Sequence, residues 1–334
     1  MDSLHTVARS ILLANLGLIG IVLGAYACHL GRRTKYRVYA FDFALGAGLT
    51  TLAYFLISGR RMHEYAFLDN LANADNDALM LGIAAAVLWA TASFVFIAAT
   101  MNAGAAFTYW VSAALWSSIG AGIPLLMRIG LNPIASLAVL MTTASAAIGV
   151  FAYVCRLRGF NQRTNSSWIS ARRLFRGFST KSPEAGDLAL PLLAGLLWAA
   201  FLALAQQSRD IKPDGLSLES IGFLTGLAVF FGGIGTCWYI VQAKRKPLRD
   251  LVMGPIHSRL EGLASGILST SGAIAILISA QFDSAMFDAP FWGALLWFTV
   301  GANSPRAFKG RLPLAGIVVV LQVAAIVVLA ISFL

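Results

Sequence analysis

Long apolar segments recur along the chain, and only short polar stretches separate them. Each segment holds about twenty mostly apolar residues, the length at which an α-helix crosses the hydrocarbon core of a bilayer. The first segment is predicted to be a retained span rather than a signal peptide, because no small-x-small cleavage site leads into a soluble body. The pattern predicts an all-α integral membrane protein with ten transmembrane helices, at roughly 10–30, 38–58, 78–100, 104–127, 132–155, 188–207, 219–242, 260–281, 285–304 and 312–334.

The composition supports lipid as the main solvent of this chain. Hydrophobic residues make up 58% of the 334 positions and charged residues only 12%, whereas soluble domains average about 25% charged residues. A water-soluble surface cannot be built from so few charges. The bilayer is therefore the expected surrounding of most of the chain.

Basic residues are distributed unevenly among the connections that join the predicted spans. Most of the 25 lysines and arginines fall in the first, fifth, seventh and ninth connections. The positive-inside rule assigns these connections to the cytoplasm. Both termini are therefore expected on the non-cytoplasmic side of the cell membrane, which is the inner or plasma membrane. Cationic connections beside anionic headgroups account for the net charge of +10 without a nucleic-acid partner.

The chain resembles itself when it is shifted by about 180 residues. Several matches occur in order and keep nearly one offset. The best match lies in the fourth and ninth predicted spans, where a Leu-Trp pair precedes a proline: Leu115-Trp116 with Pro124, and Leu296-Trp297 with Pro305. Trp and Pro are rare here, so the ordered matches indicate a duplication.

A duplicated unit of five spans enters the membrane the opposite way up in its second copy, because five is odd. We predict a first five-helix repeat over 1–155, a basic cytoplasmic linker over 156–187 and a second, inverted five-helix repeat over 188–334. Inverted repeats are the construction of alternating-access transporters. Aromatic residues interleave with arginines in the linker, which fits either an amphipathic segment on the leaflet surface or a loosely ordered connection.

The order of these features resembles the drug/metabolite transporter superfamily, and within it the ureide-permease and sugar-porter branches. The ten predicted spans in five-plus-five form carry the resemblance, together with the stretch Tyr39-Ala40-Phe41-Asp42-Phe43, which is similar to the opening of the second span in ureide permeases. The stretch 81–154, rich in small residues, and its counterpart in the second half resemble a third-to-fifth-span module. The resemblance implies a secondary transporter whose solutes are nucleobase-like compounds, ureides or sugars.

Ionisable side chains inside a bilayer are costly, so each one is a functional candidate. Asp42 lies about one turn into the second predicted span, where burial disfavours its charged form and suits a carboxylate that exchanges protons. Its alternative role is structural, as an acid near the positive end of the helix dipole or as the partner of Arg37. Glu261 opens the eighth predicted span just after Arg259 and is the second candidate for proton coupling, with an interfacial cap or ion pair as its alternative.

No Lys, Arg, Asp or Glu falls near the centre of a predicted span. A pathway without fixed charge suits a neutral or zwitterionic solute, which aromatic walls and a few hydrogen bonds can hold. We predict a central cavity between the two halves, in which Asn15 supplies hydrogen bonds and four tryptophans form the walls: Trp89, Trp116, Trp198 and Trp297. Ordinary packing is the alternative role of each tryptophan.

The sequence favours a secondary transporter of a small solute that works by alternating access. The alternatives are a lipid-linked flippase of the same superfamily, which would need a laterally open cavity, and a non-transporting assembly or sensor protein. An enzyme is disfavoured, since the chain has no HExxH or DxxDG motif and only four histidines and three cysteines. We therefore expect no catalytic residues, no metal and no cofactor, and the oligomeric state is left open.

Overall fold

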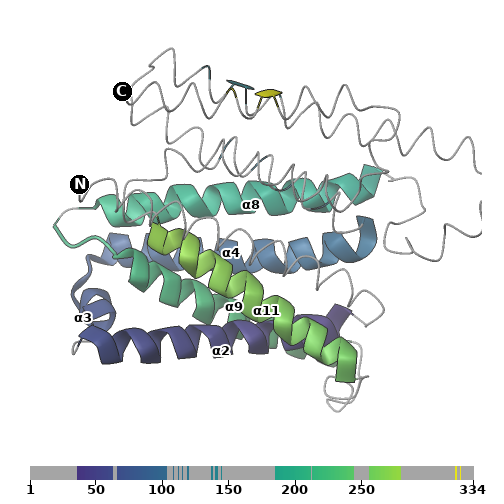
Figure 1. Ribbon diagram of the computed structural model, residues 1–334, viewed down its shortest axis with the longest axis horizontal. Coiled ribbons are helices and arrows are strands. Elements are labelled where there is room, and N and C mark those ends of the chain that lie inside the picture. The colour runs from purple at the N-terminus through teal and green to yellow at the C-terminus, as the bar shows by residue number, and fades with distance from the viewer. Residues whose placement is uncertain are drawn as a thin grey trace, which may run out of the picture. The chain divides into compact units, whose positions relative to one another are not determined.

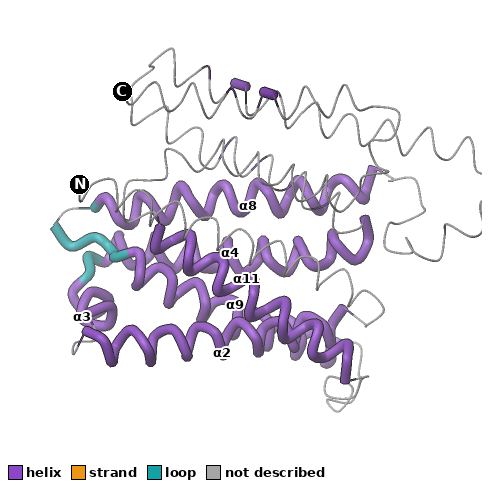
Figure 2. Tube along the Cα trace, in the orientation of Figure 1, coloured by secondary structure: helices purple, strands orange, loops and turns teal. Residues whose placement is uncertain are grey.

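The computed structural model describes residues 36–62, 66–103, 185–211, 213–243 and 256–279, with a few single positions between 108 and 144 and between 320 and 324. These ranges form α-helices and contain no strand; described turns join α3 to α4 and α8 to α9 (Figures 1 and 2). The predicted all-α class is therefore confirmed for the described part of the chain. Five predicted spans lie outside the described ranges, apart from those single positions: 10–30, 104–127, 132–155, 285–304 and 312–334.

Six helices make up the described ranges. They are α2 (Tyr36–Met62), α3 (Ala66–Asn73), α4 (Asn76–Ala103), α8 (Ala185–Asp210), α9 (Leu218–Ala243) and α11 (Ile256–Ser279). Four of them contain a stretch long and apolar enough to cross a membrane: Val38–Leu56, Asn76–Met101, Ala189–Asp210 and Leu218–Tyr239. These stretches correspond to the second, third, sixth and seventh predicted spans, and α11 covers most of the eighth. The short helix α3 was not expected from the sequence.

The chain divides into two compact units that do not follow the order of the sequence. One unit combines residues 1–97 with 200–284, and the other combines 98–199 with 285–334. Each unit thus takes residues from both predicted repeats, and both α4 and α8 contribute to the two units. The boundaries of the predicted repeats stay a prediction, since packing units and duplicated segments need not coincide.

Glycines bring α2 and α11 into direct backbone contact in the first unit (Figure 1). A Cβ on Gly262 or Gly266 would meet atoms of α2, and a Cβ on Gly46 would meet the backbone of α11 around Leu263. Gly262 and Gly266 have the small-x-x-x-small spacing that lets two helices approach closely in a membrane. Later residues of α11 meet later residues of α2, so the two helices run parallel.

The helix α9 packs against α2 in the opposite direction. Residues later in α9 contact residues earlier in α2: Gly226 contacts Thr51, Phe230 contacts Gly48, and Gly233 contacts Ala44. Steps of three and four residues keep each row of contacts on one helix face. The directions of α2, α9 and α11 agree with alternate crossings of one membrane, as the order of the second, seventh and eighth predicted spans requires.

In the second unit, α8 meets a residue of the predicted fourth span. Ser112 donates a hydrogen bond of 2.8 Å to the carbonyl of Pro191, and a Cβ on Gly195 would meet the backbone of Ser112. Proline inside a helix lacks a backbone N–H and loosens the local hydrogen bonding. The acceptor that loses its donor is the carbonyl four positions before the proline, so the Ser112 bond does not replace it; the bond ties α8 to the predicted fourth span.

Adding a methyl group at the α2–α11 contact is expected to destabilise the protein. Gly46→Ala and Gly266→Ala place a Cβ against backbone atoms that cannot rotate away, and overpacking of this kind costs about 1–3 kcal/mol. Thermal unfolding in detergent should show a lower midpoint for both variants.

Gly235→Ala is the matched control for this experiment. Nothing lies within 4 Å of the Cβ position at Gly235, and alanine favours a helix over glycine by up to about 1 kcal/mol. The midpoint of this variant should stay unchanged or rise. An equal loss of stability in all three variants would contradict the close contact of α2 with α11.

Candidate functional site

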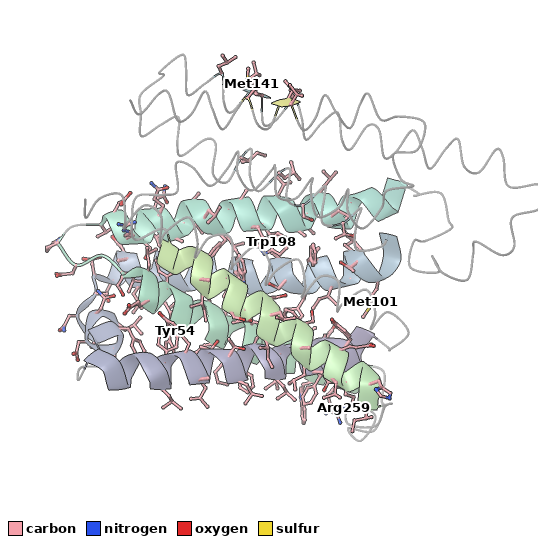
Figure 3. The ribbon with its side chains drawn as sticks, viewed as in Figure 1. Tyr54, Met101, Met141, Trp198 and Arg259 are labelled. Atoms are coloured by element: carbon pink, nitrogen blue, oxygen red, sulfur yellow. The ribbon has the colours of Figure 1, made fainter. Side chains whose placement is uncertain are left out.

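A partly buried ion pair joins the beginnings of α2 and α11. Arg259 donates from Nη2 to Oδ1 of Asp42 at 2.9 Å, and its Nε lies 3.3 Å from each carboxylate oxygen. The side chain of Asp42 is 3% exposed and that of Arg259 is 27% exposed. Figure 3 labels Arg259 at the end of α11 that lies beside the start of α2. The guanidinium therefore engages both oxygens of the carboxylate, which is a strong geometry for charge-assisted hydrogen bonds.

The glycine contact between the two helices makes room for this pair. Gly262 stands three positions after Arg259 on α11, so both residues face α2. A Cβ on Gly262 would come within 2.9 Å of the Asp42 Cβ. A larger residue at 262 would therefore push the carboxylate away from the guanidinium.

The pair offsets two unfavourable electrostatic situations. The Asp42 charge is removed from water, and a buried charge is tolerated when it is paired and hydrogen-bonded. Arg259 lies in the first turn of α11, where the positive end of the helix dipole disfavours a cation. The hydrogen bond that Arg259 donates to Asp42 raises the pKa of the guanidinium, which consequently stays charged.

The structure gives Asp42 a partner that the sequence did not indicate. Proton exchange or pairing with Arg37 is the expectation from the sequence, and the side chain of Arg37 lies outside the described residues. The partner is Arg259, 217 positions later. Glu261 is half-buried on α11, and Arg259 bonds Asp42 rather than this neighbour. Proton coupling by Asp42 and Glu261 stays a prediction.

Two of the four predicted pathway tryptophans lie in described helices, and both are buried. Trp89 on α4 is 8% exposed, and its ring centroid lies 4.8 Å from that of Phe201 on α8. Trp198, labelled on α8 in Figure 3, is equally buried. Burial fits both a pathway wall and ordinary packing, so their role stays a prediction. Outside the described residues lie Asn15, Trp116 and Trp297.

A polar cluster centred on Asn70 lies at the opposite end of the first unit. Asn70 of α3 donates through Nδ2 to the carbonyl of Gly215 at 3.0 Å. Its Oδ1 accepts from the Ser217 amide at 2.8 Å and from the Ser220 hydroxyl at 2.7 Å. These bonds tie α3 to the connection between α8 and α9, and Figure 2 shows that connection beside α3.

The same region starts two long helices. Ser217 caps α9, since its hydroxyl accepts from the Ser220 amide at 3.1 Å, and Asp75 caps α4 by accepting from the Asp77 amide at 2.8 Å. The amide of Asp75 also donates to the carbonyl of Asp214 at 2.9 Å. A serine or aspartate before an apolar run is an ordinary helix-start signal, which could have been found in the sequence. The bond between Asp75 and Asp214, which joins two connections far apart in the chain, could not have been found there.

Aromatic packing holds the apolar side of α3. The ring of Phe67 lies 4.4 Å from that of Phe55 on α2 and 5.1 Å from that of Phe223 on α9, measured between centroids. Phe55 and Phe223 are also in contact, at 4.7 Å. The helix α3 is therefore anchored on both sides and covers this end of α2 and α9.

The two ends of the first unit differ in charge. The connections that adjoin the starts of α2 and α11 are rich in lysine and arginine. Acidic residues gather at the α3 end: Asp69, Asp75, Asp77, Asp210, Asp214 and Glu219. Within the described ranges, no group of three or more His, Cys, Asp or Glu residues could hold a metal ion. The orientation of these ends in the membrane stays a prediction.

Hydroxyl groups inside the long helices bond chiefly to their own backbone. Thr51, Ser93 and Thr225 each donate to the carbonyl four positions earlier, at 2.9, 2.9 and 2.7 Å. Such a bond satisfies a hydroxyl in apolar surroundings without help from another helix. Ser208 of α8 is different, because it donates to the carbonyl of Ala78 at the start of α4 at 2.7 Å. It reinforces the end of the unit that carries α3.

Asn70→Ala is expected to loosen the α3 end of the first unit. The variant loses three hydrogen bonds, which at about 0.5–1.5 kcal/mol each predicts a loss of roughly 2–4 kcal/mol. Hydrogen exchange should rise in the connection between α8 and α9. In the control Asn73→Ala, the lost bond is an exposed one to the carbonyl of Asp69 within α3, and surface changes of this kind stay within about 0.5 kcal/mol. Equal effects in both variants would contradict the role of Asn70 in tying α3 to the connection between α8 and α9.

Comparison with known proteins leaves the family of this chain open. No protein-family model, curated protein or solved structure matches it. The resemblance to the drug/metabolite transporter superfamily therefore stays a prediction from the sequence.

Proposed function

We propose that the protein is a secondary transporter of a small neutral or zwitterionic solute, of the nucleobase, ureide or sugar-like class, that works by alternating access. It would act in the cell membrane as ten spans in two inverted repeats, with both termini outside, in the manner of the drug/metabolite transporter superfamily. One observation carries the proposal. The partly buried pair of Asp42 and Arg259 joins a helix of the first predicted repeat to a helix of the second.

The ion pair between the two predicted halves is better explained by a contact that opens and closes than by a contact that only stabilises the fold. Well-packed apolar residues of similar volume stabilise a protein as well as a buried ion pair or better. Charged groups at membrane depth commonly mark a transport pathway or a proton relay. The contact around the pair is made by glycines, so α2 and α11 present smooth faces on which small sliding motions are feasible.

The residues inside the described spans support an uncharged or zwitterionic solute. Asp42 is the charged residue that lies deepest, and the remaining charges stand at span ends: Asp77, Arg209, Asp210 and Glu219. Buried aromatic rings such as Trp89 and Phe201 offer flat apolar surfaces. Apolar walls with few polar groups suit small molecules without net charge.

The first test measures binding and then flux. Purified protein is screened by thermal shift against nucleobases, ureides, sugars and amino acids, because a ligand at 100 times its Kd stabilises the folded state by about 2.7 kcal/mol. Compounds that bind are then tested for uptake into proteoliposomes. Trp89→Phe should weaken binding by roughly tenfold, the equivalent of one aromatic stacking contact.

Trp238→Phe on α9 is the control for that substitution. Its side chain is 52% exposed, so binding should be unchanged. Equal binding by both variants and the parent would remove Trp89 from the pathway. A folded protein that neither binds nor transports any of the four classes would favour the assembly or sensor role.

Asp42→Asn tests proton coupling directly. The amide keeps the size of the carboxyl group but cannot bind and release a proton. We expect the variant to lose solute accumulation driven by a proton gradient and to keep exchange of labelled for unlabelled solute near the parent rate. Glu261→Gln is measured in parallel, and a loss confined to that variant would assign coupling to Glu261. Loss of accumulation and exchange together in folded Asp42→Asn would indicate a binding role instead.

A further inference from the structure

We propose that the Asp42–Arg259 pair is a latch that holds the beginnings of α2 and α11 together and that opens when Asp42 binds a proton. The inference rests on the proposed function, to which it adds the moving contact and its trigger. Its test uses no solute, so that failure of the latch and failure of the transport proposal can be told apart.

The two partners differ in what they can do when they separate. Arg259 is 27% exposed and has a long side chain that can carry its charge to water or to lipid headgroups. Asp42 is 3% exposed on a short side chain and has no such route. An unpaired buried carboxylate is strongly disfavoured, whereas a neutral carboxyl group is tolerated. Opening and proton binding at Asp42 are therefore linked.

Arg259 bonds this carboxylate, and two further titratable side chains lie on the helix faces that pack around it. The three groups are Arg259 of α11, Cys237 of α9 and Tyr39 of α2. Cys237 follows Gly233 by one turn on the face of α9 that contacts α2, and its thiol lies within electrostatic reach of Asp42. A neutral thiol and a phenol bring no positive charge. Of these three groups, Arg259 carries the positive charge and favours the charged carboxylate.

The two ends of the first unit are held by different kinds of contact. At the α3 end, neutral hydrogen bonds around Asn70 and a cluster of three phenylalanine rings fix the helices. At the other end, the contact of α2 with α11 is made by the pair and by glycines, and Phe43 of α2 also packs edge-on against Phe94 of α4. Loss of the pair thus releases α2 from α11 at that end only, and the α3 end acts as the pivot.

Cys237 supplies a built-in reporter, because its side chain is fully buried on the face of α9 that contacts α2. Cys28 and Cys155 are replaced by serine, and the rate at which N-ethylmaleimide alkylates Cys237 is measured in proteoliposomes. Asp42→Asn and Arg259→Gln should both accelerate labelling by on the order of tenfold or more, since removing either partner strongly disfavours the closed contact. Asp77→Asn, exposed at the opposite end, should leave the rate unchanged.

The direction of the two effects separates opening from a purely electrostatic influence on the thiol. Without opening, loss of the negative Asp42 would favour the reactive thiolate and loss of the positive Arg259 would disfavour it. Opposite changes in the two variants would therefore overturn the latch, and so would no change in either. The labelling ratio of Asp42→Asn to the parent should also fall toward one as the pH is lowered, because protonated Asp42 mimics the amide. A ratio independent of pH would overturn the trigger.

A second reporter distinguishes local opening from general unfolding. Thr51→Cys, combined with Cys237→Ser, places a thiol at a buried site of α2 that faces Gly226, toward the α3 end. Arg259→Gln should leave labelling at position 51 unchanged. Equal acceleration at both positions would mean that the pair stabilises the whole unit rather than one local contact, and it would overturn the latch. Accelerated labelling of Cys237 in a protein without solute flux would keep the latch and reject the transporter.

Discussion

The close backbone approach of α2 to α9 and α11 is the constraint on which the rest of the first unit depends. In lipid there is no hydrophobic driving force between helices, so contact area and interhelical polar bonds must hold them. Glycines such as Gly46, Gly233 and Gly266 increase the contact by removing side chains from it. The same removal leaves smooth surfaces with little to fix the position of one helix along another. Polar groups at the two ends of the unit fix the position of each helix along its neighbour.

Those polar groups differ in what can undo them. The Asn70 cluster consists of neutral donors and acceptors, whose strength changes little with pH or ionic strength. The pair of Asp42 and Arg259 depends on a charge that a proton can remove. The unit is thus held by an unresponsive contact at one end and a responsive contact at the other. A motion confined to one end follows from this difference without any further hinge element.

The sequence predicted the long helices because apolar length is a local property of the chain. It missed α3, whose eight residues are too short for a span and lie in what reads as a polar connection. It also missed Arg259 as the partner of Asp42. In the sequence, Arg37 is the basic residue near Asp42 and Glu261 is the acidic residue near Arg259, so each suggested a local partner instead. A usable signal was present, since Gly262 and Gly266 follow Arg259 and mark the face of α11 that approaches another helix. Which helix it approaches is a property of the tertiary fold.

The separation of Asp42 from Arg259 along the chain has a consequence for biosynthesis. The two residues are 217 positions apart, and chains grow at about 5–20 residues per second, so roughly 10–40 seconds pass between their syntheses. During this interval α2 can reach the membrane while its counter-charge has not yet been made. The nascent helix must keep its acid near the headgroups or carry it uncharged until α11 arrives.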